Sequence, residues 1–245
     1  IWRAPSMEAI VRAIDVGFGN TKYVVAAQGG RVECAHFASI AYDSAHDNTG
    51  DALGSKRKTV CVPVGGMWYE VGPDVALAAD GFVGRNHHDD YMRTHEYRAF
   101  TAGALHFMKV DRVDLLVLGL PVADYMRRRA ELQKAMTGTF EVGRNRKVEV
   151  KRVLVVAQPQ GAMYAVFGDQ ANAKLRQGRT LVIDAGSRTF DWLVTLDSKV
   201  VGKMSDSVNR GVYDILVKIA AAVASETGRG YQNLEAIDKA LRSRK

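Results

Sequence analysis

Cysteine and proline are scarce in this sequence, and long apolar runs are absent. The 245 residues include 5 prolines and 2 cysteines, Cys34 and Cys61. Two cysteines cannot build the disulfide framework of a small secreted domain, and their spacing fits no common metal motif. No stretch approaches the ~18 consecutive apolar residues that a membrane-spanning helix needs. The sequence therefore predicts a cytoplasmic protein with two free thiols and no membrane partner.

Three familiar sequence signals are also missing. Residues 1–6 lack the apolar stretch and cleavage site of a signal peptide, and we expect Met7 to be the native start. Neither the GxxxxGK[ST] loop nor the GxGxxG loop occurs. The two commonest phosphate-binding loops are therefore excluded.

Positive charge exceeds negative charge. The composition is that of a globular protein, with 47% hydrophobic and 25% charged residues, but the net charge is +7. This balance favours anionic partners without saying which anion. Most short basic runs are explained by solvated loops and helix ends, although they are also candidates for weak direct contact with nucleic acid. The runs are residues 56–58, 127–129, 144–147 and 242–245.

Apolar periodicity predicts alternating strands and helices, which is typical of an α/β protein with a largely parallel core. The alternation begins again near Gly178. We therefore expect one domain over residues 7–177, with a small insertion at about 39–90, and a second over 178–245. Strands are predicted at 10–14, 22–26, 31–37, 113–118, 148–156, 180–183, 192–196 and 200–204, with a hairpin over 59–72. Helices are predicted at 90–109, 121–136, 160–167, 212–225 and 234–242.

A divergent repeat carries the chemistry. In each copy an apolar strand ends in an aspartate, a glycine follows two residues later, and a polar turn leads into a new apolar strand. The aspartates are Asp15 and Asp184, and the glycines are Gly17 and Gly186. A tight glycine-containing hairpin exposes backbone N–H groups that can accept phosphate oxygens. An aspartate at the strand end can hold Mg²⁺, usually through water. Two ordinary hairpins with Asp and Gly in their turns are the alternative.

These motifs resemble those of a known superfamily. Residues 15–22 (DVGFGNTK) look like the first phosphate motif of the actin, heat-shock chaperone and sugar kinase superfamily, and residues 184–191 (DAGSRTFD) look like the second. Residues 118–125 (LGLPVADY) are similar to a strand-to-helix junction of the ParM/StbA plasmid-segregation family. Within that family, the PRTRC system protein D group is the most similar. The resemblance spans residues 7–245.

The resemblance implies an actin-like (ribonuclease H-like) two-domain α/β fold with a nucleotide cleft between the domains. ATP or GTP would bind there with Mg²⁺, which Asp15 and Asp184 would organise. The phosphates would be held from both sides by residues of the two turns. These are Gly17, Phe18, Gly19, Asn20 and Lys22 from the first turn, and Gly186, Ser187, Arg188 and Thr189 from the second.

The resemblance also implies a catalytic glutamine near the start of the connecting helix, acting with the two aspartates. Gln160, after Pro159, matches the position best, and Gln158 is the second choice. A polar helix N-terminus is the alternative explanation for both. Because glutamine is a weak base, hydrolysis should be slow and depend on positioning. Gly211 precedes a predicted helix, whose N-terminus would be a favourable anion site near the nucleotide.

By the same resemblance, the protein would polymerise with itself on binding ATP and segregate plasmid DNA through an adaptor bound to a centromere-like site. Two departures stand out. Arg188 replaces a small or hydroxylated residue, and the superfamily's adenine-binding segment does not follow residue 245, so the second domain is expected to be incomplete. A small-molecule kinase of the same superfamily and a non-hydrolysing DNA-binding structural module are the alternative functions.

Overall fold

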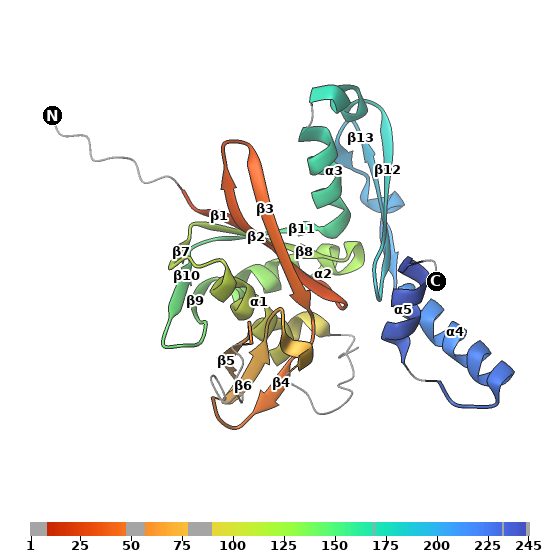
Figure 1. The fold of residues 1–245 in the computed structure, drawn as a ribbon. Helices are drawn as coiled ribbons and strands as arrows, with labels where there is room; N and C mark the ends of the chain where they lie inside the picture. The colour runs from red at the N-terminus through yellow and green to blue at the C-terminus, as the bar shows by residue number, and fades with distance from the viewer. Residues whose placement is uncertain (1–8, 48–56, 78–89, 169, 232, 244–245) are drawn as a thin grey trace. The chain divides into compact units, whose positions relative to one another are not determined.

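The computed structural model describes residues 9–47, 57–77, 90–168, 170–231 and 233–243 (Figure 1). The chain divides into two compact units, Ile1–Gly161 and Ala162–Lys245. The division falls within helix α3 (Gln158–Gly168), whereas the sequence analysis placed a boundary after residue 177. Among the described residues, no helix combines the length and the apolar character needed to cross a membrane.

A five-stranded mixed sheet forms the centre of the first unit, in the order β11-β8-β1-β2-β3. Strand β8 pairs in parallel with both β1 and β11, while β2 is antiparallel to β1 and to β3. The connections flanking β2 are hairpin turns, which only antiparallel neighbours allow. The core is therefore less parallel than the sequence predicted. The strands are β1 (Val11–Val16), β2 (Asn20–Gln28), β3 (Arg31–Ala38), β8 (Leu115–Leu120) and β11 (Val153–Ala157).

Two helices pack against this sheet. Helix α1 (His95–Phe107) contacts β1 and β2, and α2 (Val122–Ala135) contacts β8 and β11. Thr94 is the N-cap of α1, and its hydroxyl accepts a hydrogen bond from Tyr97 N at 3.2 Å. Phe37 of β3, 2% exposed, lies between the sheet and α1. Its ring centroid is 6.4 Å from that of Phe100 and 6.1 Å from that of Phe107.

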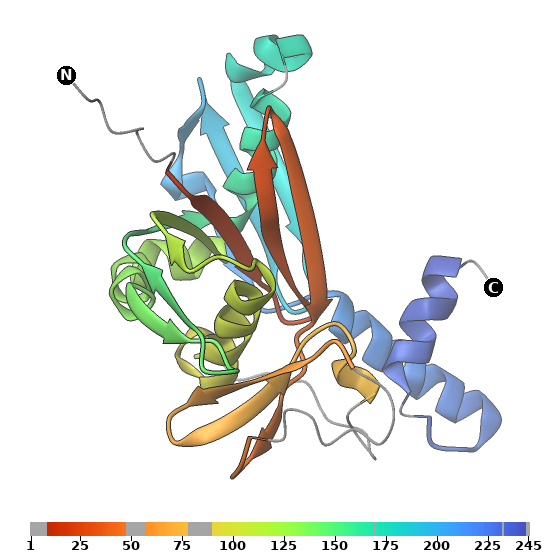
Figure 2. The same ribbon diagram turned by 60° about the vertical axis from the view of Figure 1, so that its left-hand side comes forward.

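The predicted insertion is a separate antiparallel sheet in the order β4-β6-β5, formed by β4 (Tyr42–Ser44), β5 (Val60–Val64) and β6 (Met67–Val71). The predicted hairpin turns at Gly65 and Gly66, both of which have positive φ. Two short 3₁₀ helices, η1 (Val75–Leu77) and η2 (Tyr91–Arg93), flank the part of the insertion that lies outside the described residues. A third sheet joins β7 (Arg112–Val113), β10 (Lys147–Val150) and β9 (Gly138–Glu141). Figure 2 shows the long β2–β3 hairpin of the main sheet.

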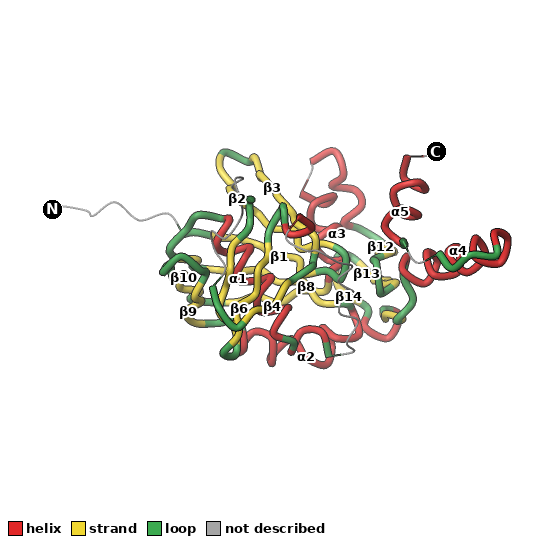
Figure 3. Tube along the Cα trace, turned by 60° about the horizontal axis from the view of Figure 1, so that its bottom comes forward, coloured by secondary structure: helices red, strands yellow, loops and turns green. Residues whose placement is uncertain are grey.

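The second unit contains a four-stranded antiparallel sheet and a helix pair. The strands are β12 (Arg179–Ala185), β13 (Phe190–Leu196), β14 (Lys199–Val200) and β15 (Asp206–Val208). The 3₁₀ helix η3 (Gln170–Arg176) precedes β12, and η4 (Gly202–Met204) lies between β14 and β15. Helices α4 (Val212–Thr227) and α5 (Leu234–Ser243) follow each other at the end of the chain (Figure 3). They pack through Leu216, Ala220 and Ile237.

Three predicted elements differ from the structure. The single strand predicted over 148–156 is two strands, β10 and β11, which belong to different sheets. The strand predicted over 200–204 is largely η4, because Ser205 N turns back to the carbonyl of Gly202. The helix predicted from residue 90 begins at His95, after the 3₁₀ turn η2.

Gly103 of α1 provides a test of this packing. Alanine in a helix interior is normally better than glycine by about 1 kcal/mol. Here a Cβ would lie 2.4 Å from Cγ2 of Val71, which is fully buried, and overpacking of this kind costs ~1–3 kcal/mol. We expect Gly103→Ala to lower the free energy of unfolding in urea titrations. Gly161→Ala is the matched control, since nothing lies within 4 Å of its Cβ position. Equal stability of the two variants would contradict the packing.

Candidate functional site

The two repeat motifs form hairpins with the same register. In the first unit Asp15 pairs with Lys22 across β1 and β2. In the second unit Asp184 pairs with Asp191 across β12 and β13. The number of residues in the turn is therefore the same in both hairpins. The sequence repeat is a repeat of structure, with each copy in its own unit.

A glycine closes each turn in the same way. Gly17 N donates to the carbonyl of Asn20 at 3.2 Å, and Gly186 N donates to the carbonyl of Thr189 at 2.9 Å. A Cβ on Gly17 would lie 3.0 Å from the Asn20 oxygen, and one on Gly186 would lie 3.1 Å from the Thr189 oxygen. Both contacts are tighter than a side chain normally accepts. The turns favour glycine because the carbonyl oxygen three residues later approaches so closely.

The first turn places a cation and a carboxylate side by side. Lys22 Nζ lies 3.4 Å from Asp15 Oδ2, and both side chains are exposed, at 66% and 37%. An exposed pair of this kind contributes at most about 1 kcal/mol. A phosphate could therefore draw Lys22 away at little cost.

Gln158 is the glutamine that contacts Asp15. Its Nε2 donates to Asp15 Oδ1 at 2.7 Å. The preferred candidate, Gln160, is 9% exposed, and its Oε1 accepts from Ala157 N at 2.9 Å at the start of α3. The side chain of Gln160 thus caps the helix, while that of Gln158 faces the first motif. The sequence analysis preferred Gln160 to Gln158, and the sequence alone could not show which of the two contacts Asp15, because a cap and a site residue look alike in sequence.

Gly119 belongs to this site and was missed. A Cβ on Gly119 would lie 2.9 Å from Cγ of Gln158 and 3.6 Å from Asp15 Oδ1. The missing side chain lets the glutamine reach the aspartate. A glycine inside an otherwise apolar strand was the available signal, since it often marks a close approach.

Helix α4 holds the second turn from its N-terminus. Val212 N donates to the Gly186 carbonyl at 3.1 Å, and Tyr213 N donates to the Ser187 carbonyl at 2.9 Å. Gly211 N donates to Asp214 Oδ2 at 2.9 Å. The sequence analysis expected this helix end to bind an anion. Its first N–H groups are instead engaged with the turn and the cap, so Gly211 serves the site by positioning the turn.

The remaining predicted residues of the second motif differ in exposure. Thr189 is 8% exposed, whereas Ser187 and Arg188 are partly exposed. Asp191, in the register position of Lys22, is 1% exposed and accepts a hydrogen bond from the Ser207 hydroxyl. The buried Asp191 carboxylate therefore holds Ser207, whereas the exposed Lys22 at the same register position could reach a phosphate.

A Mg²⁺ ion fits the residues of the first motif. Within the described part of the chain, no three His, Cys, Asp or Glu side chains gather into a metal cluster. Mg²⁺ needs no such cluster, because it keeps several waters and takes one or two carboxylates plus phosphate oxygens. Asp15 keeps acceptor capacity beyond its contacts with Gln158 and Lys22, since a carboxylate offers about four lone-pair sites. Asp184 is the corresponding carboxylate of the other unit.

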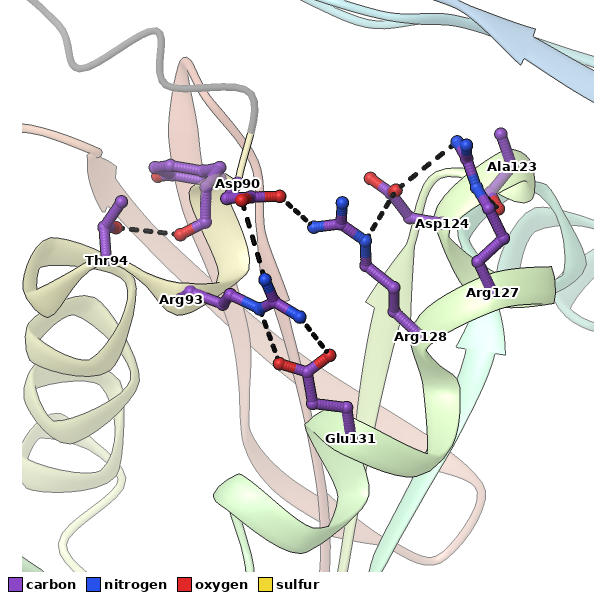
Figure 4. Close-up of polar contacts among 9 residues, drawn as sticks. Asp90, Arg93, Thr94, Ala123, Asp124, Arg127, Arg128 and Glu131 are labelled. Carbon is purple, nitrogen blue, oxygen red and sulfur yellow. Dashed lines mark hydrogen bonds and ion pairs between the residues drawn. The ribbon is translucent and has the colours of Figure 1, made fainter.

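The arginines of the basic run 127–129 contact neighbouring side chains, and Figure 4 shows those of Arg127 and Arg128. Arg128 pairs with Asp90 and lies 3.7 Å from Asp124, and Arg127 lies 3.8 Å from Asp124. Arg129 lies over the Tyr125 ring, 5.2 Å from its centroid. Of these contacts, only the pair of Arg128 with Asp90 joins α2 to another segment, and the others lie within the helix.

Gly211→Ala tests the support of the second turn. A Cβ at Gly211 would lie 2.4 Å from the Ser187 carbonyl oxygen, and backbone cannot move away as a side chain can. We expect a loss of about 2 kcal/mol or more of stability and faster amide exchange over residues 186–190. Gly230→Ala, where nothing lies within 4 Å of the Cβ position, should change neither. Unchanged exchange in Gly211→Ala would refute the contact.

Comparison with known proteins agrees with this geometry. Residues 13–161 match the family described as actin like proteins N terminal domain, and residues 182–244 match archaeal actin homologue MreB-like, C-terminal. A search of curated proteins gave no significant match.

Solved structures share the fold at low identity. Ta0583, an archaeal actin homolog, is 22% identical with a TM-score of 0.69, over 95% of this chain and 71% of that chain. The apo psk41 ParM protein is 18% identical with a TM-score of 0.66, over 96% and 74%. An AlfA filament bound to AMPPNP is 20% identical with a TM-score of 0.60, over 89% and 76%. Since the first family match alone spans more than half of the residues, the chain belongs to the actin-like protein family.

Proposed function

We propose that this protein binds ATP with Mg²⁺ through its two turns, hydrolyses it slowly, and polymerises into filaments that segregate plasmid DNA. One observation carries the proposal. Asp15 and Asp184 are the next-to-last residues of equivalent strands in different units, and the turns that follow have the same register and the same glycine closure. Two such turns are the parts needed to hold one polyphosphate from two sides.

The orientation of the peptides supports phosphate binding by the second turn. In a planar trans peptide, the C=O and the following N–H point in opposite directions. Helix α4 holds the carbonyls of Gly186 and Ser187, so the N–H groups of Ser187 and Arg188 point away from α4. Relatives bind nucleotides: Ta0583 has been solved in complex with ADP, and an AlfA filament with AMPPNP. We extend that property to this chain, with ATP preferred and GTP as the alternative.

Each unit contributes one carboxylate for Mg²⁺. When bound, the ion would neutralise part of the phosphate charge. Lys22 is the side chain of the first turn that would neutralise more of it. Asp15 would take the ion from one unit and Asp184 from the other, in both cases through water. Gln158 lies beside the first of these carboxylates, since its Nε2 donates to Asp15 Oδ1 at 2.7 Å.

We further propose Gln158, in preference to Gln160, as the glutamine that orients the attacking water. The Gln160 amide oxygen is committed to the Ala157 N–H, whereas Gln158 lies against the predicted metal-binding aspartate. A glutamine acts by positioning rather than as a base, so turnover should be slow.

Filament structures of similar proteins support the proposed self-assembly. AlfA from B. subtilis plasmid pLS32 and Alp12 have been solved as filaments, and they share this fold with TM-scores of 0.57 and 0.54. For this chain we propose assembly with further copies of itself in the cytoplasm. An adaptor bound to a centromere-like plasmid site would connect the filament to DNA.

Sedimentation with Mg²⁺ and ATP tests the proposal. The parent protein should pellet above a critical concentration with ATP and remain in the supernatant without it. Asp184→Asn removes the charge that the ion requires, so ATP affinity should fall by roughly tenfold or more and pelleting should be lost. Asp206→Asn is the control, since Asp206 is an exposed aspartate of the same sheet.

Two results would point elsewhere. A parent protein that turns over ATP only with a small-molecule acceptor and never pellets would be a kinase. Salt-sensitive DNA binding with no nucleotide requirement would indicate a DNA-binding module.

The two glutamines give a separate prediction. Gln158→Ala should lower ATP turnover by about 10- to 100-fold with little change in ATP affinity, because it removes positioning rather than phosphate contacts. Gln160→Ala should instead lower the melting temperature, because it leaves the buried Ala157 N–H without its acceptor. Equal turnover in Gln158→Ala and the parent protein would rule out the proposed role.

A further inference from the structure

Ser39 donates hydrogen bonds to two carbonyls of the first turn, those of Gly17 and Gly19. Its hydroxyl donates to the Gly17 carbonyl at 2.6 Å, and its backbone N–H donates to the Gly19 carbonyl at 3.1 Å. Ser39 is 4% exposed, so these hydrogen bonds are shielded from water. The residue immediately follows β3, outside both repeat motifs.

The two hydrogen bonds orient two peptide planes. The described chain has no cis peptide bond. With the Gly17 and Gly19 carbonyls directed at Ser39, the N–H groups of Phe18 and Asn20 must point away from it. Ser39 therefore holds two carbonyls of the first turn, as the N-terminus of α4 holds two of the second. The first carbonyl is the equivalent one, Gly17 or Gly186, and the second lies one position later in the first turn.

The Ser39 hydroxyl is itself fixed by a neighbour. It lies 3.0 Å from the hydroxyl of Thr21, which is fully buried. Because Ser39 spends its single hydroxyl proton on Gly17, Thr21 must donate to Ser39. The result is a directed chain from Thr21 through Ser39 to the turn.

Tyr91 supports the same turn from another element. Its hydroxyl donates to the Gly17 carbonyl over a longer 3.4 Å, and its ring stacks on Phe18 with centroids 4.2 Å apart. Tyr91 is 8% exposed. Burial raises the pKa of its hydroxyl far above the ordinary value, so the group remains a donor throughout the physiological range.

Ser39 and Tyr91 lie where the chain leaves the main sheet for the insertion and where it returns. Strand β3 ends just before Ser39, and η2 begins at Tyr91. The return segment is anchored on α2. Asp90 pairs with Arg128, and Arg93 Nε donates to Glu131 Oε1 at 2.6 Å (Figure 4). Thr94 adds a hydroxyl hydrogen bond to the Tyr91 carbonyl at 2.8 Å.

We propose that Ser39 and Tyr91 are positioning residues that set the peptide orientation of the first turn for phosphate and tie that turn to both ends of the inserted subdomain. This inference rests on the proposed ATP binding for its ligand. Ser39 should contribute more than Tyr91 to the turn's orientation, because its hydrogen bond to the Gly17 carbonyl is shorter.

The test combines hydrogen exchange without nucleotide and titration with Mg²⁺ and ATP. Ser39→Ala should speed amide exchange over residues 15–21 and weaken ATP affinity by about five- to tenfold, with KM rising more than kcat falls. Ser39→Thr, which keeps the hydroxyl, should restore part of the affinity. Tyr91→Phe should show the same changes to a smaller degree.

Matched controls remove buried hydroxyls that do not touch the turn. Thr101 donates to the Tyr97 carbonyl within α1, and the Tyr97 hydroxyl is buried with no hydrogen-bond partner among the described residues. Thr101→Val and Tyr97→Phe should therefore leave turn exchange and ATP affinity at parent values, whatever they do to the melting temperature.

The outcomes separate this proposal from the proposed function. If the parent binds ATP but Ser39→Ala and Tyr91→Phe match their controls in turn exchange and affinity, the positioning role is overturned and the proposed function stands. If the parent binds no ATP, the proposed function fails. Exchange over residues 15–21 then decides by itself whether Ser39 and Tyr91 hold the turn.

Discussion

The hydrogen bond from a glycine N–H to the carbonyl three residues later is the constraint on which both turns depend. It closes the turn after Asp15 at 3.2 Å and the turn after Asp184 at 2.9 Å. Closure leaves a Cβ on Gly17 or Gly186 only 3.0 or 3.1 Å from the carbonyl oxygen that closes the turn. It also fixes the turn length, and thereby the register that places each aspartate at the end of its strand.

The supports behind the two turns differ although the turns are alike. In the second unit, backbone N–H groups at the start of α4 hold the turn carbonyls. In the first unit, Ser39 and Tyr91 supply the donors. In the second unit, Gly211 lets the start of α4 approach the turn closely enough for its N–H groups to reach the carbonyls. In the first unit, the buried hydroxyl of a side chain takes that role. A repeat can therefore conserve the geometry of a turn while the residues that hold it are recruited from unrelated elements.

The sequence predicted most of the fold because its strands and turns carry local signals. The hairpin at Gly65-Gly66 and the repeat around Gly17 and Gly186 follow from turn chemistry. Local signals do not predict that residues 148–156 divide into β10 and β11, because the division depends on which sheet each half joins.

For the candidate site too, the sequence predicted what depends on local turn signals. The motif residues lie where the repeat placed them, but whether the two turns act on one ligand stays a prediction. Other parts of the site depend on contacts between residues far apart in sequence. Ser39 contacts Gly17, Gln158 contacts Asp15, and Gly119 leaves room for that second contact. Neither periodicity nor motif spacing contains that information, so the sequence could not show that Gln158, and not Gln160, contacts Asp15.

A double-mutant cycle on ATP binding tests most directly whether Asp15 and Asp184 serve one metal-bound polyphosphate. Calorimetry with Mg²⁺ and ATP would compare the parent, Asp15→Asn, Asp184→Asn and the double variant. If both carboxylates hold the same ion, the losses should be non-additive, with a coupling energy of about 1 kcal/mol or more. Strictly additive losses, or no loss in either single variant, would contradict a shared site.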